Sequence, residues 1–143
     1  MKTDISNIQD LKSFAAEFGK AFFVEPFSVI LFRGTLGTGK TTTISLIANE
    51  LNVKDVIQSP TYVIVREYPL DLPAERLYHI DLYRLSSIEE IFEYGIFDLL
   101  ALKKGIFCIE WPELLEEELR EYLSFVKTVS LSFEGEKRFL ELR

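Results

Sequence analysis

One stretch of this sequence decides its fold: Gly34-Thr35-Leu36-Gly37-Thr38-Gly39-Lys40-Thr41. It matches G-x-x-x-x-G-K-[ST], the pattern of a phosphate-binding loop, or P-loop. The apolar run Ser28–Arg33 before it predicts a strand, and Thr41–Leu51 after it has apolar side chains at helical spacing. The motif needs this order of strand, loop and helix. We therefore predict a nucleotide site and disfavour the alternative, a chance glycine-rich turn.

The residue types of the loop explain how it would hold phosphates. Glycines let the backbone fold around phosphate oxygens where a Cβ would clash, and amides at a helix N-terminus attract anions. We expect Lys40 to reach the β- and γ-phosphates and the Thr41 hydroxyl to bind Mg²⁺. The predicted cofactor-binding residues of the loop are Leu36, Gly37, Thr38, Gly39, Lys40, Thr41 and Thr42.

Composition limits the class of protein. The chain has 143 residues, of which 48% are hydrophobic, enough to build a core. Its net charge of −7 argues against nucleic-acid binding through the general surface, because phosphate contacts need Lys and Arg. The single cysteine, Cys108, excludes an internal disulfide and is expected to be buried and inert. With no long apolar stretch and no signal-peptide pattern, we expect a soluble, cytoplasmic protein without a membrane contact.

The rest of the chain shows helix and strand patterns bounded by turn residues. Helices are expected over Ser6–Phe22, from Ser87 through Glu90, over Ile96–Leu102 and over Glu113–Leu123. Strands are expected as two hairpins, Tyr62–Tyr68 with Arg76–Asp81 and Lys127–Phe133 with Lys137–Leu142, and as a buried strand over Ile106–Trp111. We therefore predict one domain, residues 1–143, with an α/β P-loop NTPase fold in which helices flank a mixed central sheet.

Two carboxylates complete the expected site. A P-loop needs acids that hold Mg²⁺ and position water, and ligands bind at the carboxyl ends of strands in open α/β sheets. Asp81 closes one predicted strand and Glu110 closes another. Glu110 has the Walker-B form, a carboxylate delivered by an apolar strand. For each acid, an ordinary position at a strand end is the alternative.

Two residues that occur once each allow more than one interpretation. Trp111 is the only tryptophan and directly follows Glu110, so a core position is the default, and a position beside the nucleotide or at an interface is the alternative. His79 is the only histidine, and no Ser, Cys or second His lies in evident register with it. A structural role for His79 is therefore favoured over a catalytic one.

Four blocks of sequence resemble the TsaE (YjeE) family. They are residues 34–42, Ser59-Pro60-Thr61-Tyr62, His79-Ile80-Asp81-Leu82-Tyr83-Arg84-Leu85 and Glu110-Trp111-Pro112-Glu113. Their order and spacing agree with those of the family, and the second and third blocks are more specific than the P-loop. The resemblance is close over residues 28–113, whereas the N-terminal helix and the C-terminal strands match only in outline.

The resemblance implies a function. The family is the ATPase component of bacterial threonylcarbamoyladenosine synthesis, the modification of adenosine 37 in tRNA, and works with the partner proteins TsaD and TsaB. It implies that the loop binds ATP and that Thr41 and Glu110 bind Mg²⁺. The implied catalytic residues are Lys40, Asp81 and Thr61, the last on a switch-like loop, and Trp111 would adjoin the nucleotide. The tRNA would be contacted indirectly, through the partners.

The resemblance also draws attention to two further positions. Its second P-loop residue is often Asp, whereas this chain has Thr35. The loop backbone does the phosphate binding, so this change affects the expectation for partner contact and not that for nucleotide. Family members contact adenine through an N-terminal segment, which corresponds here to the region Asn7–Asp10.

Three other functions are compatible with a P-loop. A small-molecule kinase would need an acceptor pocket and an arginine-bearing lid, for which Arg66 and Arg84 are the candidates. A GTPase would need a guanine-reading motif, and Asn52-Val53-Lys54-Asp55 has the wrong order and follows the P-loop helix too closely. A nucleotide-gated binding module with negligible turnover is not separated from an ATPase by sequence.

Overall fold

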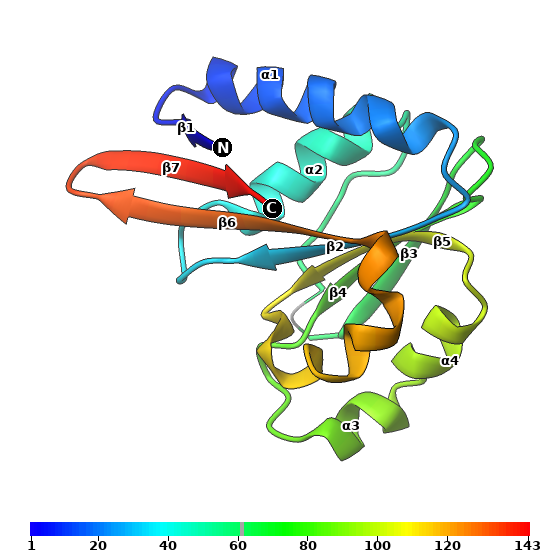
Figure 1. The fold of residues 1–143 in the computed structure, drawn as a ribbon. Helices are drawn as coiled ribbons and strands as arrows, with labels where there is room; N and C mark the ends of the chain where they lie inside the picture. Colours follow the sequence, from blue (N-terminus) through cyan, green and yellow to red (C-terminus); the bar gives the residue numbers. More distant parts are fainter. Residues whose placement is uncertain (61) are drawn as a thin grey trace.

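Seven strands in the described part of the chain form one mixed sheet, in the order β1-β7-β6-β2-β5-β4-β3 (Figure 1). The computed structural model describes residues 1–60 and 62–143, apart from the side chain of residue 123. The strands are β1 (Lys2–Asp4), β2 (Phe27–Arg33), β3 (Val65–Pro69), β4 (Arg76–Asp81), β5 (Gly105–Glu110), β6 (Val126–Glu134) and β7 (Lys137–Leu142).

The centre of the sheet is parallel and its flanks are antiparallel. β2 pairs in parallel with β5 and β6, and β5 pairs in parallel with β4. The pairs β3–β4, β6–β7 and β1–β7 are antiparallel. The predicted α/β fold with a mixed sheet and two hairpins is confirmed. Because β2, β4 and β5 are parallel, their carboxyl ends meet at the same edge of the sheet. The P-loop follows β2 there, and Asp81 and Glu110 are the last residues of β4 and β5.

Helices cover both faces of the sheet (Figure 1). One face carries α1 (Ile8–Gly19) and α2 (Lys40–Glu50); the other carries α3 (Ile88–Glu93), α4 (Ile96–Ala101) and the 3₁₀ segments η2 (Pro112–Leu115) and η3 (Glu118–Phe125). Side chains of β2 alternate between two cores, Ile30 and Phe32 in one, Val29 and Leu31 in the other. A strand covered on both faces is apolar throughout. None of the helices described is long and apolar enough to cross a membrane.

Two helices begin at side-chain caps. Asn7 Oδ1 accepts a hydrogen bond from the Gln9 amide at the start of α1 (2.9 Å). Ser87 Oγ accepts one from the Glu90 amide at the start of α3 (3.4 Å). The helix expected over residues 6–22 is therefore correctly placed, but α1 ends at Gly19 and a 3₁₀ turn, η1 (Lys20–Phe23), continues it.

The strand expected over Tyr62–Tyr68 begins three residues later in the structure, as β3. β3 begins at Val65, and residues 62–64 belong to a turn. Ile64 has a φ of 69°, and its amide donates to the Pro60 carbonyl (2.6 Å), so the chain bends before the strand begins. The apolar alternation was a true strand signal, but a residue in the left-handed region interrupts it.

The prediction of an α-helix over Glu113–Leu123 is wrong, because the 3₁₀ segments η2 and η3 occupy this part of the chain. These segments bury Leu115, Leu119 and Tyr122 against the sheet. A 3₁₀ helix and an α-helix place apolar residues at similar spacing, so the pattern does not separate them. β1 gave no signal in the sequence, since it has three residues and pairs with the distant strand β7.

Candidate nucleotide-binding site

The P-loop backbone takes conformations that only glycine accommodates easily. Gly34 has a φ of 150°, and a Cβ there would lie 2.5 Å from Thr38 Oγ1 and 2.8 Å from the Leu131 carbonyl oxygen. Gly39, with a φ of 101°, leads into α2. Thr38 is buried, and its hydroxyl donates to the Thr35 carbonyl (2.8 Å). The Thr38 amide donates to the same carbonyl (3.3 Å), so the Thr38 residue holds the turn of the loop together from within.

Lys40 lies across the mouth of the loop. Its Nζ donates to the carbonyls of Gly34 (2.6 Å) and Thr35 (3.1 Å) and sits 4.3 Å from the centre of the Trp111 ring. Burial lowers the pKa of Lys40, while the nearby carboxylates of Glu110 and others act in the opposite direction. The Lys40 ammonium is held by neutral carbonyl oxygens and an aromatic ring. A charged phosphate oxygen would bind it more strongly than these partners do.

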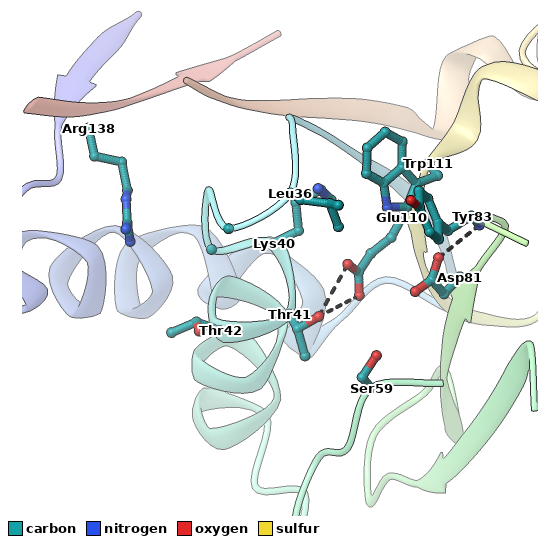
Figure 2. Close-up of a pocket in the computed structure, with 12 residues that line it drawn as sticks. Leu36, Lys40, Thr41, Thr42, Ser59, Asp81, Tyr83, Glu110, Trp111 and Arg138 are labelled. Carbon is teal, nitrogen blue, oxygen red and sulfur yellow. Dashed lines mark hydrogen bonds between the residues drawn. The ribbon is translucent and has the colours of Figure 1, made fainter. Parts of the chain in front are cut away.

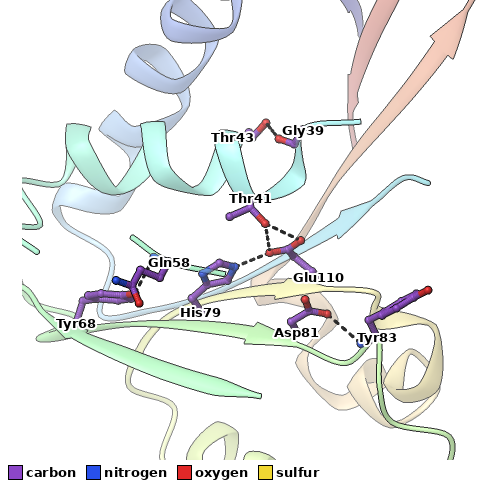
Figure 3. A network of polar contacts seen from close by, with 9 residues as sticks. All are labelled: Gly39, Thr41, Thr43, Gln58, Tyr68, His79, Asp81, Tyr83 and Glu110. Carbon is purple, nitrogen blue, oxygen red and sulfur yellow. Dashed lines mark hydrogen bonds and ion pairs between the residues drawn. The ribbon is translucent and has the colours of Figure 1, made fainter. Parts of the chain in front are cut away.

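Thr41, Glu110 and His79 form a hydrogen-bonded polar group at the P-loop, in which Glu110 and His79 are buried (Figure 3). The Thr41 hydroxyl donates to the Glu110 carboxylate, 2.9 Å from Oε2 and 3.2 Å from Oε1. His79 Nε2 lies 2.6 Å from Oε2 of the same carboxylate. Glu110 is 3% exposed and His79 is fully buried. The structure thus joins the first residues of α2 to the ends of β4 and β5.

The donors present fit Mg²⁺. Mg²⁺ prefers oxygen ligands and usually takes one or two from protein, the rest coming from phosphates and water. Thr41 and Glu110 offer a hydroxyl and a carboxylate oxygen already in contact with each other. Among the described residues, no three His, Cys, Asp or Glu side chains are grouped to hold a metal by themselves. This donor set suits a metal shared with a nucleotide.

Asp81 lies beside Glu110 at the same edge of the sheet. The two residues are paired in the register of β4 with β5, and Asp81 is 4% exposed. Asp81 Oδ1 accepts a hydrogen bond from the Tyr83 amide (2.9 Å), and the Asp81 amide donates to the Ile64 carbonyl (3.0 Å). The carboxylate is therefore oriented by the turn that follows β4.

Trp111 is at the cleft and not in the strand expected to contain it. β5 ends at Glu110, and Trp111 has a φ of 55°. Its half-buried ring contacts Lys40 and lies 5.0 Å, centre to centre, from the ring of Tyr83. A left-handed conformation is costly for a bulky residue, and such conformations cluster at functional sites. The structure therefore favours a position of Trp111 beside the candidate nucleotide site over a core position.

These residues line a cleft of about 450 Å³ (Figure 2), a size typical of small-molecule sites. Its lining residues are Leu36, Gly37, Gly39, Lys40, Thr41, Thr42, Ser59, Asp81, Tyr83, Glu110, Trp111 and Arg138. All residues named from the sequence as cofactor-binding, catalytic or metal-binding are here except Thr38, which lies beneath the loop, and Thr61, which is outside the described residues.

Among the described residues, Arg138 is the one that lines the cleft and lies outside every sequence block that suggested the site. It lies in β7, across the P-loop from Glu110 (Figure 2), and its Nη1 would be 3.2 Å from a Cβ on Gly39. Nothing in the closing hairpin marks this arginine, because its position depends on how β7 passes the loop. Ser59 and Tyr83 also line the cleft; both belong to the blocks that resemble the family, but the sequence pattern assigns neither of them a role.

The features that would support other functions lie elsewhere. Arg66 and Arg84 do not line the cleft, and the Arg84 guanidinium stacks 4.2 Å from the Tyr62 ring centre. Residues 52–55 follow the C-terminal end of α2, whereas the P-loop is at its N-terminal end. Cys108 is fully buried and burial raises the pKa of its thiol, as expected for an inert cysteine.

A strand, a glycine-rich loop and a helix at the edge of a mixed sheet, with a carboxylate under the loop, define a P-loop NTPase. The family model for "Threonylcarbamoyl adenosine biosynthesis protein TsaE" matches residues 5–139. The chain therefore belongs to the TsaE family, which confirms the resemblance and gives it the family's role in tRNA threonylcarbamoyladenosine biosynthesis.

Curated relatives and a solved structure agree with this assignment. The protein TsaE of Rickettsia bellii is 34% identical over 82% of this chain and 78% of its own length, and that of Treponema pallidum is 36% identical over 69% and 70%. The Bacillus subtilis protein is 37% identical over 69% of this chain and 60% of its own length. The crystal structure of Bacillus subtilis YdiB superposes with a TM-score of 0.68 at 27% identity, covering 98% of this chain and 82% of that one.

Proposed function

We propose that this protein is the ATP-hydrolysing component of the complex that makes N6-threonylcarbamoyladenosine at position 37 of tRNA, acting in the cytoplasm with TsaD and TsaB. The observation that carries the proposal is the contact of Thr41 with Glu110 directly beneath a P-loop whose lysine is free of any carboxylate hydrogen bond in the described structure. This arrangement suits a nucleoside triphosphate with bound Mg²⁺.

The residues have distinct parts in the proposed reaction. The loop amides and Lys40 bind the phosphates, and Lys40 exchanges the carbonyls of Gly34 and Thr35 for phosphate oxygens. Thr41 and Glu110 would hold Mg²⁺, which neutralises charge on the phosphate oxygens when bound. Asp81 orients the attacking water, whose oxygen bonds to the γ-phosphorus as the bond to the ADP oxygen breaks. Lys40 and the amides stabilise the charge that develops.

The partners have two expected effects. The chain is acidic, so the partner proteins would supply the basic surface that tRNA needs. The cleft is open to solvent, and a partner surface that covers it would exclude water and fix the segment after Ser59 near the γ-phosphate. Hydrolysis would then release that segment and reset the partner complex, without transfer of the carbamoyl group by this chain.

Steady-state phosphate release tests the proposal. We expect slow hydrolysis by the protein alone and faster turnover with TsaD, TsaB and tRNA present. A rate that ignores the partners would contradict the coupling. Binding without any turnover would leave a nucleotide-gated binding module, and transfer of the γ-phosphate to an added nucleoside would instead indicate a small-molecule kinase.

A further inference from the structure

His79 lies next to the candidate metal ligand although it does not line the cleft. It is the only histidine of the chain and is fully buried in β4. Its Nε2 is 2.6 Å from Glu110 Oε2, while its Nδ1 has no hydrogen-bond partner in the described structure. The sequence favoured a structural role because no catalytic partner was visible, but the partner is a carboxylate on another strand.

The register of the sheet explains this contact. In the pairing of β4 with β5, His79 lies opposite Cys108 and Asp81 lies opposite Glu110. His79 is therefore two residues before the position opposite Glu110, on the neighbouring strand. Figure 3 shows the imidazole meeting the carboxylate from the sheet while Thr41 meets it from α2. An ionised carboxylate only accepts hydrogen bonds, so the imidazole donates through Nε2–H.

We propose that His79 is a positioning residue for Glu110, and the proposal rests on the Mg²⁺ role proposed above. Oε2 accepts the hydrogen bonds from His79 (2.6 Å) and Thr41 (2.9 Å), whereas among the described residues Oε1 has only the longer contact with Thr41 (3.2 Å). Oε1 is therefore the oxygen with the capacity to bind a cation. The His79 imidazole holds Oε2 inside the protein, and in this way it leaves Oε1 as the oxygen that faces the cation.

Outer-shell hydrogen bonds of this kind control metal affinity, and their loss typically costs about 10- to 100-fold. His79→Leu removes the donor and keeps an apolar side chain of moderate size. His79→Gln restores an N–H at a position close to Nε2. Leu77→Val is the matched control, because Leu77 is buried two residues earlier on the same strand and the same face.

The experiment measures the Mg²⁺ dependence of nucleotide binding with a fluorescent ATP analogue, in EDTA and across a Mg²⁺ titration. We expect all variants to bind alike in EDTA. His79→Leu should need about 10- to 100-fold more Mg²⁺, His79→Gln should recover most of the loss, and Leu77→Val should match the wild type. Unchanged Mg²⁺ affinity in His79→Leu would overturn the proposal, as would an equal loss in His79→Leu and His79→Gln.

Two further measurements separate the possible failures. Glu110→Gln tests the metal role itself: unchanged Mg²⁺ affinity there overturns both proposals, whereas a loss there with none in His79→Leu overturns only the role of His79. If His79→Leu does not fold, ¹⁵N spectra of the wild type decide, because the chain has a single imidazole. Its Nε2 signal should shift when Mg²⁺ joins the bound nucleotide, and a signal that does not move refutes positioning.

Discussion

Replacing Lys40 by alanine tests the phosphate role of the P-loop lysine. Lys40 Nζ makes two hydrogen bonds to carbonyls and contacts the Trp111 ring. Binding a phosphate exchanges these neutral partners for charged oxygens. If the net gain equals that of one hydrogen bond to a charged group, about 1.5–3 kcal/mol, the affinity of Lys40→Ala for ATP should be lower by about 10- to 150-fold.

The fold should survive this substitution. Lys40 begins α2 beside an open cleft, so water can reach the two carbonyls that it leaves. The loss should be about 1 kcal/mol, which lowers Tm by about 2–4 °C. A second effect acts on binding alone: without the ammonium, Glu110, Asp81 and Glu113 face the phosphates with less compensation.

The assay is a titration of a fluorescent ATP analogue in EDTA and in Mg²⁺, together with thermal melting and phosphate release. Lys54→Ala is the matched control, because Lys54 is exposed and lies beyond the other end of α2. It should leave affinity and turnover unchanged. Equal affinity and equal hydrolysis in Lys40→Ala and the wild type would refute the reasoning.

Three more outcomes are expected. Gly34→Ala should cost about 2–6 kcal/mol through the clash with the loop and the strained φ, and thermal melting should show a much smaller loss for Gly135→Ala, where φ is also positive but a Cβ meets nothing. Trp111 emission should change when nucleotide binds, because Lys40 leaves its ring, and an unchanged spectrum at saturation would contradict that exchange. Arg138→Ala should weaken nucleotide binding by about 2- to 10-fold in the same titration; full affinity would mean that the guanidinium only borders the cleft.

The elements that sequence predicted well are those that depend on neighbouring residues. The P-loop, the cap at Ser87 and the two hairpins follow from short patterns of glycine, capping residues and alternation. The edge position of Asp81 and Glu110 followed from one general rule for parallel sheets. Their chemical roles stay predictions, as does that of Thr61.

The features that sequence did not predict depend on contacts between distant segments. The contact of His79 with Glu110 requires the register of β4 with β5, and the place of Arg138 requires the path of β7 past the loop. The turn at Ile64 could not be predicted for a different reason: no sequence pattern indicates an isoleucine with a positive φ. Tertiary packing imposes that conformation against the residue's own preference.

The backbone of Arg138 is held on both sides. Its amide donates to Ser6 Oγ (2.9 Å) and its carbonyl accepts from the Ile5 amide (2.9 Å), within a strand paired to β6. The guanidinium that borders the cleft can therefore move by side-chain rotation while the backbone of Arg138 stays in place. Access to the cleft from the β7 side thus changes by rotation of the Arg138 side chain, over picoseconds to nanoseconds. It does not require the slower displacement of a loop. Amide exchange at residue 138 should accordingly be slow and the same with or without nucleotide, even while its side chain changes place.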